Sequence, residues 1–308
     1  MRFFITGAGG YIGGSVAAVL TASGHDVRGL TRTADKAMIL SDRGIDPVIG
    51  SLDDIDLIRR ESTDAQVVIS AADADHRASV RAMIDGLSGS GRALIHTSGA
   101  SIVGDDARGE PGSGMVYDEE TPLDVQPKKR ARHAIDTMVL DSAKHGVRAA
   151  VVCPSLVYGY GRGVNPRSIQ VPFLVDQARA SGVVRVVGRG LNRWSTVHID
   201  DLTDLYRLAI EAAPAGSFYF AENGESSYAE IGEAIADSLG LPGVRSWDPD
   251  EAAAQWGAAR AYFTFGSNSR VRALRARREL GWNPRYGSVL QWIREEIPKD
   301  KGVNTHDS

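Results

Sequence analysis

The first thirteen residues constrain the fold more than any other stretch of this sequence. An apolar, β-prone run, Phe3 to Thr6, ends in a glycine cluster, and a helical pattern of small residues follows from Gly14 to Leu20. Strand, glycine turn and helix in this order place a helix N-terminus beside bound phosphate. Gly7, Gly10 and Gly13 suit a tight turn, a close approach of backbone to a pyrophosphate, and close packing of the helix on the strand. The stretch predicts a dinucleotide-binding unit.

The end of the second expected strand, residues 25–31, decides which cofactor fits. An NAD site usually carries an acidic residue about 20 residues past the glycines, whereas an arginine there accommodates a 2′-phosphate. Thr31 and Arg32 occupy this position, with Lys36 one turn further on. Asp35 is interpreted as a charge in the first turn of the next helix. The pattern favours NADP over NAD, the alternative being that Arg32 is an ordinary solvated loop residue.

Strands and helices alternate through the first half of the chain. The stretch 66–72 is continuously apolar, as expected of a parallel strand buried on both faces. The alternation predicts an α/β fold, a Rossmann-like doubly wound parallel sheet with its ligand at the carboxyl ends of the strands. Beyond Gly159 the pattern changes to that of a smaller C-terminal substrate-binding lobe. We expect the dinucleotide-binding domain over 1–160, with 190–215 returning to it, and the lobe over 161–189 and 216–308.

Composition and charge exclude several classes of protein. The chain has 308 residues, of which 43% are hydrophobic, enough to bury a large core. No apolar run approaches the ~18–20 residues of a membrane span, and the first strand leaves no room for a signal peptide. Cys153 is the single cysteine, which fits a reducing compartment, and the net charge of −4 argues against a nucleic-acid partner. We expect a cytoplasmic protein that acts on a small molecule, with no membrane partner and no metal site.

Several stretches together resemble the extended short-chain dehydrogenase/reductase family, the NAD-dependent epimerase/dehydratase group. They are Thr6-Gly7-x-x-Gly10-Tyr11-Ile12-Gly13, Ala71-Ala72, Pro154-Ser155-Leu156-Val157-Tyr158-Gly159, Val197-His198-Ile199-Asp200-Asp201-Leu202, Ser267-Asn268-Ser269-Arg270 and Glu279-Leu280-Gly281-Trp282-Asn283-Pro284. The resemblance implies a nicotinamide dinucleotide on the N-terminal sheet and a small substrate, often a nucleotide sugar, under the lobe. It also implies a homodimer through the helices around 80–87 and 135–140.

The resemblance, together with the glycine turn and the basic strand end, yields a set of expected cofactor-binding residues. These are Gly7, Gly10, Tyr11, Ile12, Gly13, Thr31, Arg32, Lys36, Leu52, Ser70, Ala71, Ala72, Thr97, Pro154, Ser155 and Leu156.

The catalytic pattern of that family is where this sequence departs from it. The family uses a Ser or Thr after the fifth strand and a Tyr-x-x-x-Lys on the next helix, in which the tyrosine is the acid/base and the lysine holds the ribose. Gly99 occupies the usual Ser/Thr position, which leaves Ser98 as the adjacent hydroxyl. Aligning the helix on Asp136 puts Arg132 at the lysine and Lys128 at the tyrosine, whereas a shift by one residue gives alanine and proline. The chain resembles an atypical member.

A reduction still needs a proton donor within hydrogen-bond reach of the developing alkoxide. An arginine does not serve, since its pKa is above about 12. Lys128 is one candidate, although a solvated residue of a basic run is the favoured interpretation. Tyr117, the only aromatic residue of the long loop 99–127, is the other. His96 is interpreted as a core histidine.

Three functions follow from these observations. The first is an NADP-dependent oxidoreductase acting on a small carbonyl or alcohol with a non-standard acid/base. The second is an epimerase or dehydratase that keeps its cofactor. The third is a redox-inert NADP-binding sensor protein.

Overall fold

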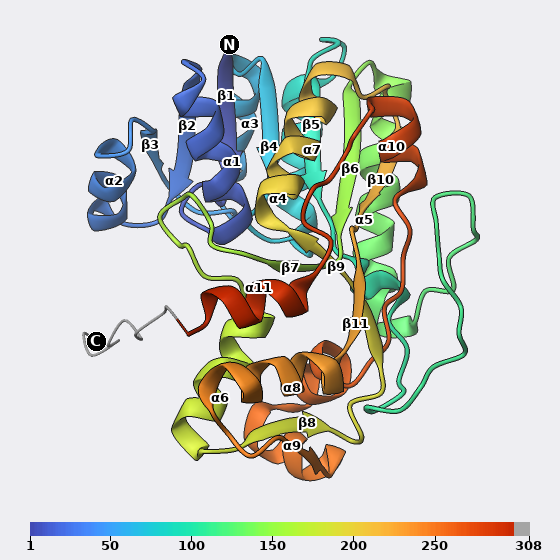
Figure 1. The fold of residues 1–308 in the computed structure, drawn as a ribbon. Coiled ribbons are helices and arrows are strands. Elements are labelled where there is room, and N and C mark those ends of the chain that lie inside the picture. Colours follow the sequence, from blue (N-terminus) through green and yellow to red (C-terminus); the bar gives the residue numbers. More distant parts are fainter. Residues whose placement is uncertain (299–308) are drawn as a thin grey trace.

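The computed structural model describes residues 1–298, and its largest element is a seven-stranded parallel sheet (Figure 1). The strand order is β10-β6-β5-β4-β1-β2-β3. Every pairing in this sheet is parallel, as the alternation of strands and helices predicts. The strands are β1 (Arg2–Thr6), β2 (Asp26–Thr31), β3 (Asp46–Ile49), β4 (Val67–Ser70), β5 (Ala93–Thr97), β6 (Arg148–Pro154) and β10 (Ser217–Ala221).

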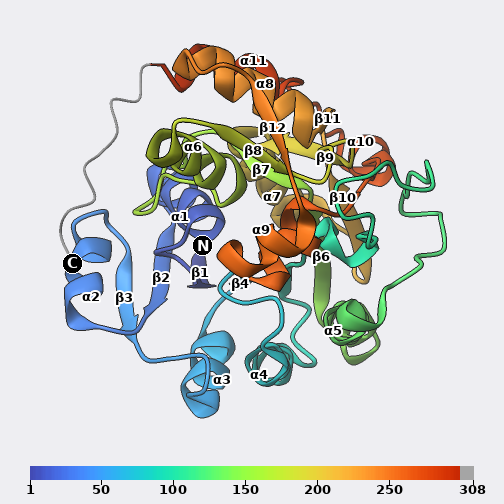
Figure 2. The ribbon, with the colours of Figure 1, turned by 90° about the horizontal axis from the view of Figure 1, so that it is seen from below.

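Helices cover both faces of this sheet (Figure 2). On one face α1 (Tyr11–Ala22), α7 (Ile199–Ala212) and α10 (Leu274–Leu280) bury their apolar side chains in one cluster. On the other face α3 (Ile55–Asp64), α4 (Arg77–Leu87) and α5 (Arg130–Asp141) form a second cluster. A short helix, α2 (Ala34–Ser41), lies between β2 and β3. The Rossmann-like doubly wound architecture expected from the sequence is confirmed.

A smaller lobe lies below the carboxyl ends of the strands, with its own apolar cluster (Figure 1). Short strands form one sheet in the order β11-β9-β7 and another from β12 and β8. The lobe and its connections contain β7 (Leu156–Tyr158), α6 (Gln170–Ser181), β8 (Val184–Val187), β9 (Arg193–His198), β11 (Glu225–Ser227), α8 (Tyr228–Leu239), β12 (Val244–Trp247), α9 (Pro249–Trp256), η4 (Ala259–Phe265) and α11 (Val289–Glu296).

The division of the chain differs from the expected boundaries at two places. β10 is the edge strand of the large sheet, paired with β6, although the boundary at 216 assigned it to the lobe. Val271, Leu280 and Trp282 are buried in the core of the dinucleotide-binding domain. Segments from the C-terminal third therefore complete the first domain, because its edge strand β10 and the helix α10 come late in the sequence.

Local start and stop signals explain most element boundaries. A capping box of Ser227 and Glu230 begins α8. The helix α5 is flanked by two short 3₁₀ turns, η2 (Pro127–Lys129) and η3 (Ser142–His145). His198 caps α7 by accepting the Asp200 N–H, and Asp200 lies in the first turn of the helix.

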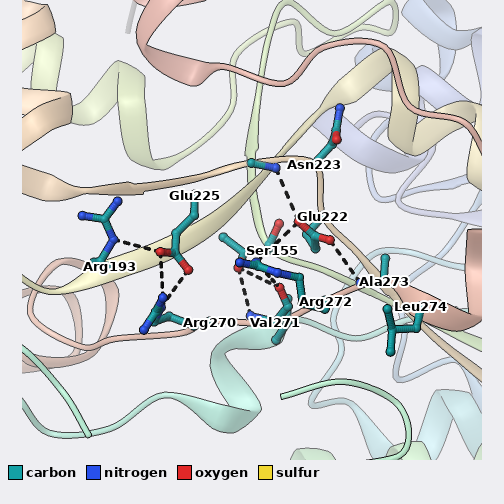
Figure 3. Close-up of polar contacts among 12 residues, drawn as sticks. Ser155, Arg193, Glu222, Asn223, Glu225, Arg270, Val271, Arg272, Ala273 and Leu274 are labelled. Carbon is teal, nitrogen blue, oxygen red and sulfur yellow. Dashed lines mark hydrogen bonds and ion pairs between the residues drawn. The ribbon is translucent and has the colours of Figure 1, made fainter. Parts of the chain in front are cut away.

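A carboxylate network joins the lobe strands to the returning C-terminal segment (Figure 3). Glu225 accepts hydrogen bonds from Arg193 Nε at 2.8 Å and from Arg270 Nε at 2.7 Å. Glu222, buried directly after β10, accepts from the Ala273 N–H at 3.2 Å and from Arg277 at 3.1 Å. These contacts fasten the segment 270–277 to β11 and to the end of β10.

Two expectations from the sequence concern membrane crossing and a homodimer, and the structure bears on both. Within residues 1–298 there is no helix with the length and apolar character that crossing a bilayer demands. The apolar side chains expected to form a dimer contact on α4 and α5, among them Met83 and Val139, are buried inside the monomer. The groove between these two helices is lined largely by polar groups such as Arg81 and Arg130. The homodimer stays a prediction.

Candidate active site

The glycine turn between β1 and α1 is shaped by close backbone contacts. Gly7 has a φ of +81°, and a Cβ there would lie 2.5 Å from the carbonyl oxygen of Ala71. A Cβ on Gly13 would lie 2.4 Å from the carbonyl oxygen of Gly7. Both positions therefore need glycine, as their spacing predicts.

No side chain of residues 1–298 caps the N-terminus of α1. Its N-cap is Gly10, which offers no side chain, and no acidic residue lies in the first turn. The N–H groups and the positive end of the helix dipole are thus left to an anionic ligand. These residues fit the pyrophosphate of a nicotinamide dinucleotide, with Ala71 and Ala72 against the turn. Tyr11 donates its hydroxyl to the Gly159 carbonyl at 2.9 Å, and burial raises its pKa.

The end of β2 presents cations to solvent. Thr31 is buried at the strand end, whereas Arg32 and Lys36 are exposed. Neither cation forms an ion pair with another residue of the described chain. Leu52 packs, partly buried, on the core beneath the neighbouring strands. The arrangement leaves both cations available for a charged group bound at this edge.

A cleft of about 680 Å³ opens between the carboxyl ends of the sheet and the lobe. Its sheet side comprises Tyr11, Ile12, Gly99, Ala100, Ser101, Lys128, Lys129, Arg132, Pro154, Ser155 and Val157. Its lobe side comprises Ser168, Ile169, Gln170, Trp194, Ala258, Ala259, Phe263 and Thr264. The cleft has the size of a small-molecule site and lies at the strand ends where ligands of this architecture bind.

Arg132 occupies the space beside Gly99. A Cβ on Gly99 would lie 3.5 Å from Arg132 Nη1. The same Nη1 donates to Ser101 Oγ at 3.3 Å, and Arg132 Nε donates to Asp75 at 2.8 Å. The hydrogen bond and charge of Arg132 lower the pKa of Asp75. Arg132 therefore does not stand free to hold a ribose, as the family lysine does, because a carboxylate that follows β4 fixes its guanidinium group.

The two hydroxyls at the end of β5 turn to partners outside the cleft. Ser98 donates to Asp136 at 2.7 Å, and Thr97 shares a 2.6 Å hydrogen bond with the hydroxyl of Tyr206. Both are buried, and neither lines the cleft. This differs from the expectation that Ser98 acts in catalysis and Thr97 at the cofactor. Ser101, in the 3₁₀ turn after Gly99, does line the cleft, and sequence reasoning missed it because it lies beyond the strand end.

Tyr117 lies outside the cleft, contrary to its expected catalytic role. Its N–H donates to the Arg270 carbonyl at 2.9 Å, and it forms an isolated bridge with Val271. Its side chain lines a separate pocket of about 210 Å³ under the loop 111–115. Burial raises its pKa, so it is also a poorer source of phenolate.

Two lysines stand at the start of α5 and line the cleft. The Lys128 ammonium lies 4.3 Å from the centre of the Phe263 ring. Lys129 is partly buried, and burial followed by the charge of Arg132 lowers its pKa. The sequence pointed to Lys128 by alignment with the family tyrosine. Lys129 differs from Lys128 in its burial, which the sequence pattern does not show.

The other expected residues divide between the cleft and the core. Pro154 and Ser155 line the cleft, and Ser155 donates to the Ala221 carbonyl at 2.9 Å. Leu156 is fully buried in the lobe cluster, so its side chain is a packing residue. Ser70 is bonded to His96 at 3.2 Å behind the sheet edge.

His96 is a core residue, as expected, but it has an unusual neighbour. Its Nε2 lies 3.6 Å from Asp136 Oδ1, and neither atom has a hydrogen-bond partner in the described chain. Burial lowers the pKa of His96 to about 4 and raises the pKa of Asp136 to about 7. A neutral histidine and a readily protonated carboxyl group thus lie directly behind the cleft.

Comparison with known proteins identifies the fold and the family. A profile of the NAD-dependent epimerase/dehydratase family matches residues 3–219. Oxidase ucsJ of an Acremonium species is 33% identical, with 92% of each chain covered. A 4-hydroxy-2-methyl-3-oxo-4-farnesyl-3,4-dihydroquinoline-1-oxide ketoreductase of Stigmatella aurantiaca is 26% identical, with 99% of each covered.

Among solved structures, the dTDP-glucose 4,6-dehydratase of Bacillus anthracis in complex with NAD has a similar fold, with a TM-score of 0.78. The two sequences are 19% identical, and the superposition covers 98% of this chain and 97% of the dehydratase chain. At this identity the likeness shows the fold alone. The family profile and the fungal relative carry the assignment further. The chain belongs to the NAD-dependent epimerase/dehydratase family and is an NAD(P)-dependent oxidoreductase of the short-chain dehydrogenase/reductase type.

Proposed function

We propose that this protein is an NADP-dependent reductase of a small carbonyl compound, with Lys129 as the proton donor that replaces the family tyrosine. The observation that carries the proposal is the cluster at the end of β5. Lys129, Arg132 and Ser101 line the same cleft as Gly99, the position at which the family has its catalytic hydroxyl, and Arg132 lies directly beside Gly99. Donors for a carbonyl oxygen are thus present in a chain without the Tyr-x-x-x-Lys pattern.

The preference for NADP rests on Arg32. Its exposed guanidinium group, which has no acidic partner among residues 1–298, stands where an NAD enzyme places a carboxylate. A charge-assisted, bidentate contact of this arginine with a 2′-phosphate adds affinity for the phosphorylated cofactor.

Gly7, Gly10 and Gly13 would hold a nicotinamide dinucleotide, which when bound would supply a hydride to the carbonyl carbon. Arg132 Nη1 and Ser101 Oγ donate hydrogen bonds toward the carbonyl oxygen and stabilise the negative charge that develops on it. Asp75 keeps the guanidinium group in place. Lys129 gives its proton to the alkoxide and regains one from solvent. Its lowered pKa suits this step, because a more acidic ammonium group transfers its proton with a smaller barrier.

The reaction of the Stigmatella relative, named a ketoreductase, supports reduction as the direction. The family profile and the dehydratase-like fold support the alternative, an epimerase or dehydratase that keeps its cofactor. Net consumption of NADPH separates the two. A redox-inert sensor would show neither net consumption nor conversion.

The test is the pH dependence of NADPH consumption by the wild type, Lys129→Met and Lys129→Arg. We expect wild-type kcat to fall as pH rises through the lowered pKa of Lys129, because only its protonated form donates. Both variants should lose kcat at least about tenfold and lose this limb of the profile, since loss of a general acid costs about 10²–10⁴-fold. Arg130→Met, on the same turn but in the groove between α4 and α5, is the matched control. A Lys129→Met enzyme with the wild-type profile contradicts the assignment.

A further inference from the structure

We propose that the substrate is an amphipathic carbonyl compound whose apolar body carries an acidic group, and that Lys128 binds this acidic group while the body packs on Ile169, Trp194 and Phe263. The inference rests on the proposed function, because the same cleft holds the reacting carbonyl.

The lobe side of the cleft is mainly apolar. Ile169 is 72% exposed at the start of α6, which is unusual for an isoleucine, and it faces the cleft. Ala259 and Phe263 come from η4, a seven-residue π-helix. Such helices are rare and occur frequently at functional sites. A ligand that covers these side chains removes apolar surface from water, which favours a hydrocarbon or aromatic body.

The charge of the cleft has one sign. Lys128, Lys129 and Arg132 line it, and among the described residues that line it there is no aspartate or glutamate. Asp75, outside the lining, is engaged by Arg132 and compensates one of the three positive charges. Two ammonium groups remain without a carboxylate in the cleft. A concave site of one sign concentrates ligands of the opposite sign, so an anionic substrate fits.

Lys128 lies where the positively charged part of the cleft borders its apolar part. Its ammonium group stands 4.3 Å from the centre of the Phe263 ring, at the border between the basic sheet side and the apolar lobe side. An acidic group bound there leaves the rest of the molecule on the apolar wall. Lys129 is more buried and lies close to Arg132, so it can act on the carbonyl group.

The polar surface of a nucleotide sugar does not match the mainly apolar lobe side of the cleft. Its hydroxyl groups need hydrogen-bond partners when they leave water. The lobe side offers the polar side chains of Ser168, Gln170 and Thr264 among mostly apolar neighbours. We therefore expect such sugars to be poor substrates.

The experiment compares NADPH consumption with phenylpyruvate, its methyl ester, pyruvate and UDP-glucose. We expect kcat/KM for phenylpyruvate to exceed those for the ester, which lacks the charge, and for pyruvate, which lacks the ring, at least tenfold. Lys128→Met should lower kcat/KM for phenylpyruvate about tenfold more than for the ester, as loss of a charged hydrogen bond predicts. Phe263→Ala should narrow the gap between phenylpyruvate and pyruvate. Arg130→Met removes a neighbouring charge outside the cleft and is the matched control.

Equal values for acid and ester, an equal effect of Lys128→Met on both, or preferred turnover of UDP-glucose would overturn the inference. If none of the compounds is reduced, the proposed function fails on this panel, and calorimetry still decides the inference. With NADP⁺ bound, phenylpropionate should bind at least tenfold more tightly than phenylpropanol, and Lys128→Met should remove this preference. Equal binding of acid and alcohol refutes an anionic substrate independently of turnover.

Discussion

Replacing Asp136 by asparagine should stabilise the protein at neutral and basic pH. Asp136 is 1% exposed, accepts a 2.7 Å hydrogen bond from Ser98, and faces His96 Nε2 at 3.6 Å. Burial raises its pKa from 3.8 to about 7, against the lowering effects of the Ser98 hydrogen bond and the charge of Arg132. Asparagine keeps an acceptor for Ser98 and adds a donor toward His96. It removes the charge that burial disfavours.

The sign and size of the change in stability follow from the raised pKa of Asp136. A folded-state pKa above the unfolded value means that the folded state binds the proton more tightly. Stability from this group is complete below pH 3.8 and is lost as pH rises to about 7. Three pKa units correspond to about 4 kcal/mol, of which about 3 kcal/mol falls between pH 5 and pH 8. Burial lowers the pKa of His96 to about 4, so His96 is neutral in the folded state over this window.

Thermal unfolding of the wild type and Asp136→Asn at several pH values measures this difference. The melting temperature of the variant should rise relative to the wild type by roughly 5 °C on going from pH 5 to pH 8. His96 titrates on unfolding in both proteins, so the difference between them isolates Asp136. Asp141→Asn, at the exposed end of the same helix, controls for loss of a carboxylate. A difference in melting temperature that is the same at pH 5 and pH 8 would refute the view that a buried carboxyl group is held neutral.

Three further predictions concern the cofactor, the lobe and the assembly. Arg32→Ala should weaken NADPH binding about 10- to 100-fold by calorimetry and leave NADH nearly unchanged, because one charge-assisted contact is lost. Wild-type protein that binds NADH as tightly as NADPH would remove the claim. Glu225→Gln should lower the free energy of unfolding by about 2 kcal/mol in urea titrations, since it weakens two ion pairs of a mostly buried carboxylate, whereas Glu211→Gln in an exposed pair should have almost no effect. Light scattering at micromolar concentration should give the mass of a homodimer, and a monomeric mass would contradict that prediction.

Local sequence patterns determined the architecture. The glycine turn, the buried apolar strands and the capping box of α8 are short-range signals, because each depends on residues within one turn or one strand. These signals, with the family resemblance, were sufficient for the parallel sheet, its ligand edge and the separate lobe. The absence of the Tyr-x-x-x-Lys motif was evident as well, because a motif of five residues is read directly from the sequence.

The tertiary structure decided which side chains line the cleft. Asp75 and Arg132 are 57 positions apart, and their contact fixes the guanidinium group beside Gly99. Two catalytic candidates were excluded in the same way. Ser98 donates its hydrogen bond to Asp136, and Tyr117 is held beside Val271. Periodicity predicts that a residue lies on a helix or strand, but the partner of a polar side chain depends on which distant segments the fold packs against it. The distinction between Lys128 and Lys129 arises in this way, because neighbouring residues on one turn differ in burial only once the lobe and α5 have met.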